Sequence, residues 1–260
     1  MNKEIFFHVG LSKTASTYLQ NRFFNKIVGI NYIGNHNYEK YHEIIEQSVS
    51  DKILVSREFD RQYNIELEKF AAIYPDAKII IVLRQHDSWM ASQYRRYLKN
   101  GGYKEFEQFF DIENNRGLWD IEDVLFYPKL QKINELFSEK PLVIFYEDIK
   151  KDIFAVFDQI TKYTGTKYNR EDINLTSKHK SYSEKQLKFV KKACRIFKND
   201  YRSKKIILSR SRWLVCHLFL FIAAITPNFL FNKKPLINPE SLEKVKEYFA
   251  EDWAKCKGSN

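Results

Sequence analysis

The stretch HVGLSKTASTYLQ, His8–Gln20, decides the fold. It overlaps the apolar run Lys3–Val9, whose composition is typical of a short buried strand. The chain then turns at Gly10, and helical spacing follows over residues 17–24. A strand, a tight turn and a helix that starts among hydroxyls bring several backbone N–H groups and the positive end of a helix dipole to one point. The stretch therefore predicts an anion site that opens a nucleotide-binding α/β unit.

The side chains of this turn strengthen the anion prediction. Lys13 adds a full positive charge, and Thr14, Ser16 and Thr17 add hydroxyl donors. A Walker-type loop carries its lysine at the end, directly before the Ser or Thr, whereas Lys13 comes early; this disfavours an ATPase. The alternative interpretation is a helix capped by Ser or Thr with a lysine nearby by chance.

The rest of the chain predicts an α/β fold. Continuous apolar runs, typical of parallel strands covered on both faces, occur at 52–56, 78–83 and 141–146. Helical patterns alternate with them at 65–73, 87–98, 127–137 and 152–163. This alternation predicts a three-layer α/β/α arrangement around a mainly parallel central sheet. We expect a single domain over residues 1–260, with a core of about 1–185 and a helical C-terminal extension over about 186–260.

A second polar motif follows the run at 78–83. Arg84 stands at the predicted strand end and Ser92 stands eight residues later, on the predicted helix. Arginine offers a fork of donors and serine a hydroxyl, so together the two side chains suit a phosphate group. A surface salt bridge of Arg84 is the alternative.

The first turn resembles the 5′-phosphosulfate loop of the sulfotransferases. Lys13 matches the loop lysine, Thr14, Ser16 and Thr17 match the hydroxyl positions, and Tyr18 matches an aromatic position that in some members stacks on adenine. Ser12 and Ala15 stand where the family usually has proline and glycine. The resemblance implies a P-loop-NTPase-like fold and a donor, 3′-phosphoadenosine 5′-phosphosulfate (PAPS), that is bound by residues 13–18.

Two further segments extend the resemblance to roughly residues 4–185. Arg84 and Ser92 match the family's 3′-phosphate site, the feature that separates PAPS from ATP. The segment VIFYEDIKK, Val143–Lys151, resembles another family motif, in which Tyr146 falls where members place a ring near adenine. A late basic loop often adds to the 3′-phosphate site, and Lys178 and Lys180 are the candidates in this chain.

The catalytic base that we expect is Glu58, just past the run at 52–56. Side chains at the carboxyl ends of parallel strands point toward the ligand, and family members with carbohydrate acceptors use a Glu in this role. An exposed surface Glu58 is the alternative, and His36 is the second candidate for the base. His8, inside the first strand, is expected to be a satisfied core histidine. Lys13 would stabilise the charge that develops during transfer, so no metal is required.

The resemblance implies a sulfotransferase that moves a sulfuryl group from PAPS to a hydroxyl of a carbohydrate or glycolipid and releases PAP, the desulfated nucleotide. The alternative function is a membrane-docked PAP- or PAPS-binding or scaffold protein with weak catalysis, for which Ala15 is the best support. We expect no nucleic-acid partner.

Positive charge and apolar residues are concentrated late in the chain. Residues 177–213 carry thirteen Lys or Arg against two acidic residues, a net charge of +11, so the remainder of a chain whose total is +10 is close to neutral. This segment is a solvated helix face or a surface for an anionic partner. The nearly apolar stretch 213–231 follows, and a membrane span, a membrane-surface hairpin and a buried or oligomer-interface helix pair all remain open for it.

The cysteines and the amino terminus bear on location. Cys194, Cys216 and Cys256 are odd in number and widely spaced in the sequence, which favours a reducing compartment. The first ten residues lack the features of a signal peptide. We therefore expect a cytoplasmic protein, with a peripheral position at the inner face of the membrane as an option.

Overall fold

The structure is a computed structural model that describes residues 3–176, 182–196, 206–227 and 234–259. The chain divides into two compact units. The first unit comprises Met1–Gln85, Leu125–Lys178 and Phe249–Asn260, and the second comprises His86–Val124 and His179–Tyr248.

The first unit contains a five-stranded, all-parallel sheet, which confirms the mainly parallel sheet that the sequence predicted. Its strands are β1 (Glu4–His8), β2 (Asn31–Ile33), β3 (Lys52–Ser56), β4 (Lys78–Leu83) and β5 (Leu142–Phe145), in the order β2-β3-β1-β4-β5. In the register, Phe6 of β1 lies between Leu54 of β3 and Lys78 of β4. The edge strand β2 was missed in the sequence, because it has only three residues and lacks a continuous apolar run.

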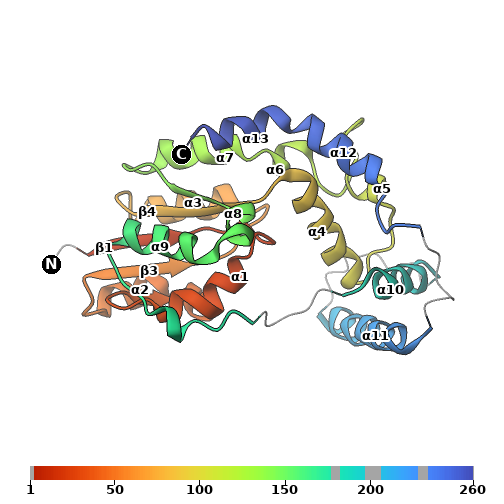
Figure 1. The fold of residues 1–260 in the computed structure, drawn as a ribbon, viewed down its shortest axis with the longest axis horizontal. Coiled ribbons are helices and arrows are strands. Elements are labelled where there is room, and N and C mark those ends of the chain that lie inside the picture. The colour runs from red at the N-terminus through yellow and green to blue at the C-terminus, as the bar shows by residue number, and fades with distance from the viewer. Residues whose placement is uncertain (1–2, 177–181, 197–205, 228–233, 260) are drawn as a thin grey trace. The chain divides into compact units, whose positions relative to one another are not determined.

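One face of the sheet is covered by the helix after the first turn and by α9 (Ile153–Thr164) (Figure 1). The expected regular helix over 17–24 is instead a single α-turn, α1 (Ser16–Tyr18), followed by the π-helix η1 (Leu19–Phe23) and the 3-10 turn η2 (Phe24–Lys26). Phe23 and Phe157 stack across this layer with ring centroids 4.0 Å apart. Both rings belong to the buried cluster that includes Phe6.

The opposite face is covered by α3 (Tyr63–Ala71) and α7 (Tyr127–Leu136), with α13 (Ala250–Lys257) packed on α7 (Figure 1). Phe7 of β1 stacks on Phe70 of α3 with ring centroids 3.9 Å apart. Asp252 of α13 accepts hydrogen bonds from the backbone N–H groups of Phe126 (2.9 Å) and Tyr127 (3.1 Å), at the start of α7. The three-layer α/β/α arrangement is therefore confirmed.

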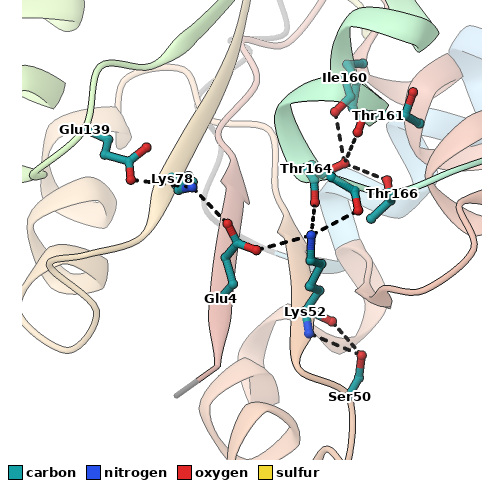
Figure 2. Close-up of polar contacts among 10 residues, drawn as sticks. Glu4, Ser50, Lys52, Lys78, Glu139, Ile160, Thr161, Thr164 and Thr166 are labelled. Carbon is teal, nitrogen blue, oxygen red and sulfur yellow. Dashed lines mark hydrogen bonds and ion pairs between the residues drawn. The ribbon is translucent and has the colours of Figure 1, made fainter. Parts of the chain in front are cut away.

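The edge of the sheet at which the strands begin, the amino edge, is held by paired charges (Figure 2). Glu4, the first residue of β1, contacts Lys78 Nζ at 2.9 Å and Lys52 Nζ at 3.4 Å, each lysine being the first residue of a neighbouring strand. Lys52 Nζ also donates to the carbonyl oxygens of Thr164 (2.6 Å) and Gly165 (3.0 Å), at the carboxyl end of α9. A cation there also interacts favourably with the helix dipole.

The remaining elements of the first unit are η3 (Asn35–Lys40), α2 (Tyr41–Gln47), α8 (Tyr146–Lys151) and η4 (Arg170–Asp172).

The described part of the second unit is helical. It contains α4 (His86–Lys99), α5 (Phe106–Phe109), α6 (Ile121–Val124), α10 (Glu184–Ile196), α11 (Ile206–Ile225) and α12 (Pro239–Tyr248). Within the basic segment 177–213, α10 extends to Ile196, and residues 197–205 lie outside the described part. The apolar stretch 213–231 falls on α11 up to Ile225.

Helices α10 and α11 pack on each other. The Sγ atoms of Cys194 and Cys216 lie 3.9 Å apart, and Phe189 and Phe219 meet edge to face. Lys185 Nζ donates to Thr226 O at 2.8 Å, just past the carboxyl end of α11. Among the helices that the structure describes, none has the length and apolarity needed to cross a membrane.

Candidate nucleotide and catalytic site

The turn after β1 is shaped by left-handed backbone at three positions. Gly10, Lys13 and Ala15 have φ angles of 97°, 67° and 72°. The turn is also tied to β4, because Val82 N–H donates to Gly10 O at 2.7 Å and Leu11 N–H donates to Val82 O at 3.0 Å. Ala15 precedes the first residue of α1. It therefore adopts the conformation that glycine adopts most easily, without being glycine.

Two of the three expected hydroxyl ligands face into the turn itself. Thr14 and Ser16 are buried, and their hydroxyls donate to Leu11 O at 2.6 and 2.9 Å. Ser12 donates to Asp60 Oδ1 at 2.5 Å, which ties the turn to the segment after β3. In this structure these hydroxyls set the shape of the turn, and direct binding of a ligand by Thr14 and Ser16 stays a prediction.

Lys13 and Thr17, by contrast, are exposed. Thr17 Oγ1 donates to Glu58 Oε1 at 2.8 Å, so the expected base lies beside the expected donor loop. Gly10 permits this approach, because a Cβ atom there would lie 3.2 Å from Glu58 Cα and 3.1 Å from Phe59 N. Neither the Thr17–Glu58 contact nor the Ser12–Asp60 contact was anticipated from the sequence.

Arg84 and Tyr146 are brought together with the loop at the carboxyl ends of β4 and β5. Arg84 Nη1 donates to Lys13 O at 3.2 Å, and Arg84 Cζ lies 4.3 Å from the centroid of the Tyr146 ring. Lys150 Nζ lies 5.3 Å from the same centroid. Glu147 accepts a hydrogen bond from the backbone N–H of Gln85 at 3.2 Å. Two cations beside an exposed lysine loop make this edge of the sheet suitable for an anionic ligand that carries an aromatic base.

His8 is a buried core histidine, as expected. Burial lowers the pKa of His8 to about 3, so the ring is neutral. Its Nδ1 lies 2.8 Å from Ser56 Oγ, which also accepts from Gln20 Nε2 at 3.0 Å. Its Nε2, however, is buried with no hydrogen-bond partner among the described residues, so the ring is only half satisfied. Burial likewise raises the pKa of the neighbouring Tyr32 to about 12.

The other candidates lie on other segments of the chain or outside the described residues. His36 is exposed on η3, the segment that follows β2. Ser92 is half-buried on α4 of the second unit, and its pairing with Arg84 stays a prediction. Lys178 and Lys180 lie in 177–181, outside the described residues. Across the described ranges, no group of three or more His, Cys, Asp or Glu side chains is placed to hold a metal ion.

A parallel α/β sheet with a cationic, hydroxyl-rich turn at the end of β1 is typical of a protein that binds a nucleotide phosphate. The sequence matches the family model described as "Sulfotransferase domain" over residues 9–211, most of the chain. The chain therefore belongs to the sulfotransferase family and is a PAPS-dependent sulfotransferase.

One solved structure agrees at the level of the fold, and a second has a lower TM-score. A sulfotransferase from Alicyclobacillus acidocaldarius is similar with a TM-score of 0.54 and 15% identity, over 84% of this chain and 97% of that chain. Mouse sulfotransferase SULT7A1, solved with PAP, gives a TM-score of 0.48 and 15% identity, over 98% of this chain and 86% of that chain. No curated protein matches the sequence.

Proposed function

We propose that the acceptor is a hydroxyl of a carbohydrate or glycolipid, and that Glu58 is the base that takes its proton. The observation that carries the proposal is the 2.8 Å hydrogen bond from Thr17 Oγ1 to Glu58 Oε1. This bond places the Glu58 carboxylate next to the loop that would hold the sulfuryl group. In the proposal, the acceptor oxygen binds at this same place. A base must come within hydrogen-bond reach of the proton that it removes, and a carboxylate beside the donor loop meets this requirement.

The proposed reaction is an in-line displacement at sulfur. The acceptor oxygen forms a bond to sulfur while the bond from sulfur to the bridging oxygen of the 5′-phosphate breaks, and PAP leaves with that bond's electron pair. The acceptor proton goes to Glu58. Lys13 and the loop N–H groups stabilise the charge that builds on the bridging and sulfuryl oxygens, as cations do in phosphoryl transfer.

We propose that PAPS, the sulfuryl donor, binds at the carboxyl edge of the same sheet. In the proposal, residues 13–18 hold the 5′-phosphosulfate, while Arg84 and Ser92 hold the 3′-phosphate, with Lys178 and Lys180 adding charge. Tyr18 and Tyr146 flank the adenine. The contact between Arg84 and the Tyr146 ring supports this assignment, because it joins a phosphate-binding cation to an aromatic surface.

The left-handed backbone at Ala15 favours the enzyme over the weakly catalytic binding protein. The loop adopts at this position a φ of 72°, in the region where glycine is the usual residue. The replacement of glycine by alanine therefore does not by itself abolish the loop.

We further propose a single catalytic domain, with its C-terminal extension, that acts in the cytoplasm and peripherally at the inner face of the membrane. A membrane-borne acceptor held near the site would be present at a high local concentration, which lessens the need for tight acceptor binding.

The test is transfer of sulfur label from PAPS to fractionated carbohydrates and glycolipids, with Glu58→Gln as the matched inactive control. The proposal expects label in at least one of these pools with the wild-type protein and little with the variant. Tight binding of PAP without transfer to any pool would favour the alternative binding protein. Label on a non-carbohydrate hydroxyl would refute the acceptor class and leave the sulfotransferase assignment intact.

A further inference from the structure

Helix α11 exposes a line of large apolar side chains. Leu214, Leu218, Phe221 and Ile225, which form the α11 stripe, are 62%, 56%, 64% and 70% exposed. Their spacing of four, three and four residues places them on one side of the helix. Elsewhere in the described chain, exposed large hydrophobic residues are scattered, which is normal for a protein surface, whereas a contiguous line marks an interaction site.

The stripe lies on the side of α11 opposite to its packed face. Cys216, Leu220 and Ala223 are buried. At about 100° per residue they lie roughly half a helical turn away from the stripe. Gln186 of α10 donates from Nε2 to Leu220 O at 3.0 Å, on this packed face. The contacts of α11 with α10 therefore leave the stripe uncovered.

The charge of the sequence leading into α11 indicates the kind of partner. The helix contains no acidic residue, and residues 177–213 carry a net charge of +11. On α10, which packs on α11, Lys192 and Arg195 are exposed. An anionic partner suits this excess of positive charge.

We propose that the α11 stripe is a docking surface for an anionic bilayer, into whose headgroup region the four side chains insert. An apolar helix face in a strongly cationic part of the sequence suits such a surface, because apolar burial and attraction to anionic lipids act together. A second copy of this chain suits it poorly, because both copies carry the same net charge of +10. The α11 stripe is thus the surface that would hold the protein at the membrane. This inference rests on the proposed peripheral membrane location and not on the proposed acceptor or catalytic base.

The test is flotation of the full chain with phosphatidylcholine vesicles that contain about one-third phosphatidylserine, compared with pure phosphatidylcholine vesicles. The probe variant is the double substitution Leu218→Ser and Phe221→Ser. The matched control is Ile65→Ser with Ile73→Ser, two exposed isoleucines of the first unit. We expect wild type and control to float with the anionic vesicles at low salt, and the probe variant to bind them at least about tenfold more weakly.

Three results would overturn the proposal. They are failure of the wild type to float, equal loss in probe and control variants, and a wild-type dimer in light scattering that the probe variant loses. The last would identify a second copy as the occupant. Thermal unfolding of each variant checks that it is folded. Transfer of sulfur label to a water-soluble acceptor separates the outcomes: a wild type that transfers label but does not float refutes only the docking surface.

Discussion

The two edges of the sheet in the first unit use charge in opposite ways. At the amino edge, Glu4 lies between Lys52 and Lys78, and Lys52 also binds the last carbonyls of α9 (Figure 2). At the carboxyl edge, Lys13 is exposed, and Arg84 contacts a backbone carbonyl and an aromatic face.

We infer that the charged side chains at the amino edge stabilise the fold, whereas those at the carboxyl edge bind the ligand. A lysine between a carboxylate and helix carbonyls is already neutralised, so its removal costs stability. Lys13 is exposed on its left-handed turn, so under the proposed function its removal is expected to cost turnover rather than stability. Substitutions that are matched across the two edges test this division directly.

The largest effect is expected for Lys13→Ala. Removing the cation that stabilises the transferred group should lower kcat by about 10³–10⁵-fold, in the range known for a single charged group in phosphoryl transfer. The matched variant Lys52→Ala at the amino edge should keep kcat and lower the melting temperature. Labelled-PAPS turnover and thermal unfolding measure the two quantities, and the division fails if the two lysines exchange phenotypes.

Glu58→Gln should lower kcat by about 10²–10⁴-fold and leave PAP affinity nearly unchanged, because only proton removal is lost. Calorimetric titration with PAP measures the affinity. Near-normal turnover in this variant, together with loss of turnover in His36→Ala, would transfer the role of base to the histidine.

Arg84→Ala should weaken PAP binding by about 2–4 kcal/mol, because a phosphate loses a charge-assisted partner. AMP lacks the 3′-phosphate and should bind wild type and variant about equally. An equal loss of affinity for both nucleotides would show that Arg84 does not bind the 3′-phosphate.

The smallest effect is expected at Glu4. Burial of Glu4 favours the neutral acid, but the hydrogen bond and charge of Lys78 and the charge of Lys52 outweigh it and hold the pKa of Glu4 below its usual value. A depressed carboxyl pKa stabilises the fold above the unfolded pKa, and this contribution is lost as the pH falls through the folded pKa. Glu4→Gln should therefore cost about 0.5–1 kcal/mol at neutral pH, given the exposure of the pair, and less near pH 4.

Urea unfolding at the two pH values measures the change at Glu4. A variant that is equally destabilised at both pH values would show that packing rather than charge is responsible. Turnover per folded molecule should stay at the wild-type level, in contrast to Glu58→Gln.

The sequence predicted the elements whose signals are local and continuous. The strands β1, β3, β4 and β5 are runs of buried apolar residues, whereas β2 consists of Asn31, Tyr32 and Ile33 and resembles a loop. Lys13, Arg84 and Tyr146 could be proposed from the resemblance because each follows a strand of one parallel sheet, and parallel strands end at one edge.

The orientation of side chains within the loop could not be read in the same way. Thr14, Ser16 and Thr17 look equivalent in the sequence, yet the first two turn inward to Leu11 O and the third turns outward to Glu58. The inward and outward directions of these hydroxyls go with the left-handed φ angles at Lys13 and Ala15. No residue type in the loop predicts those angles. The close approach of the Glu58 backbone to Gly10, where a Cβ atom would lie 3.2 Å from Glu58 Cα, is a long-range contact that local patterns do not contain.

Ala15 has a consequence for how such proteins are recognised and altered. An L-residue with left-handed backbone costs about 1–2 kcal/mol, while glycine in its place would add flexibility to the unfolded chain, worth about 0.4–1 kcal/mol. The two partly offset each other, so the exchange of glycine for alanine, which a single base change in the codon achieves, costs only about 1 kcal/mol of stability. What the loop needs is a backbone angle and not a particular amino acid. Sequence motifs that require glycine at this position will therefore miss enzymes in which another residue adopts the same backbone angle.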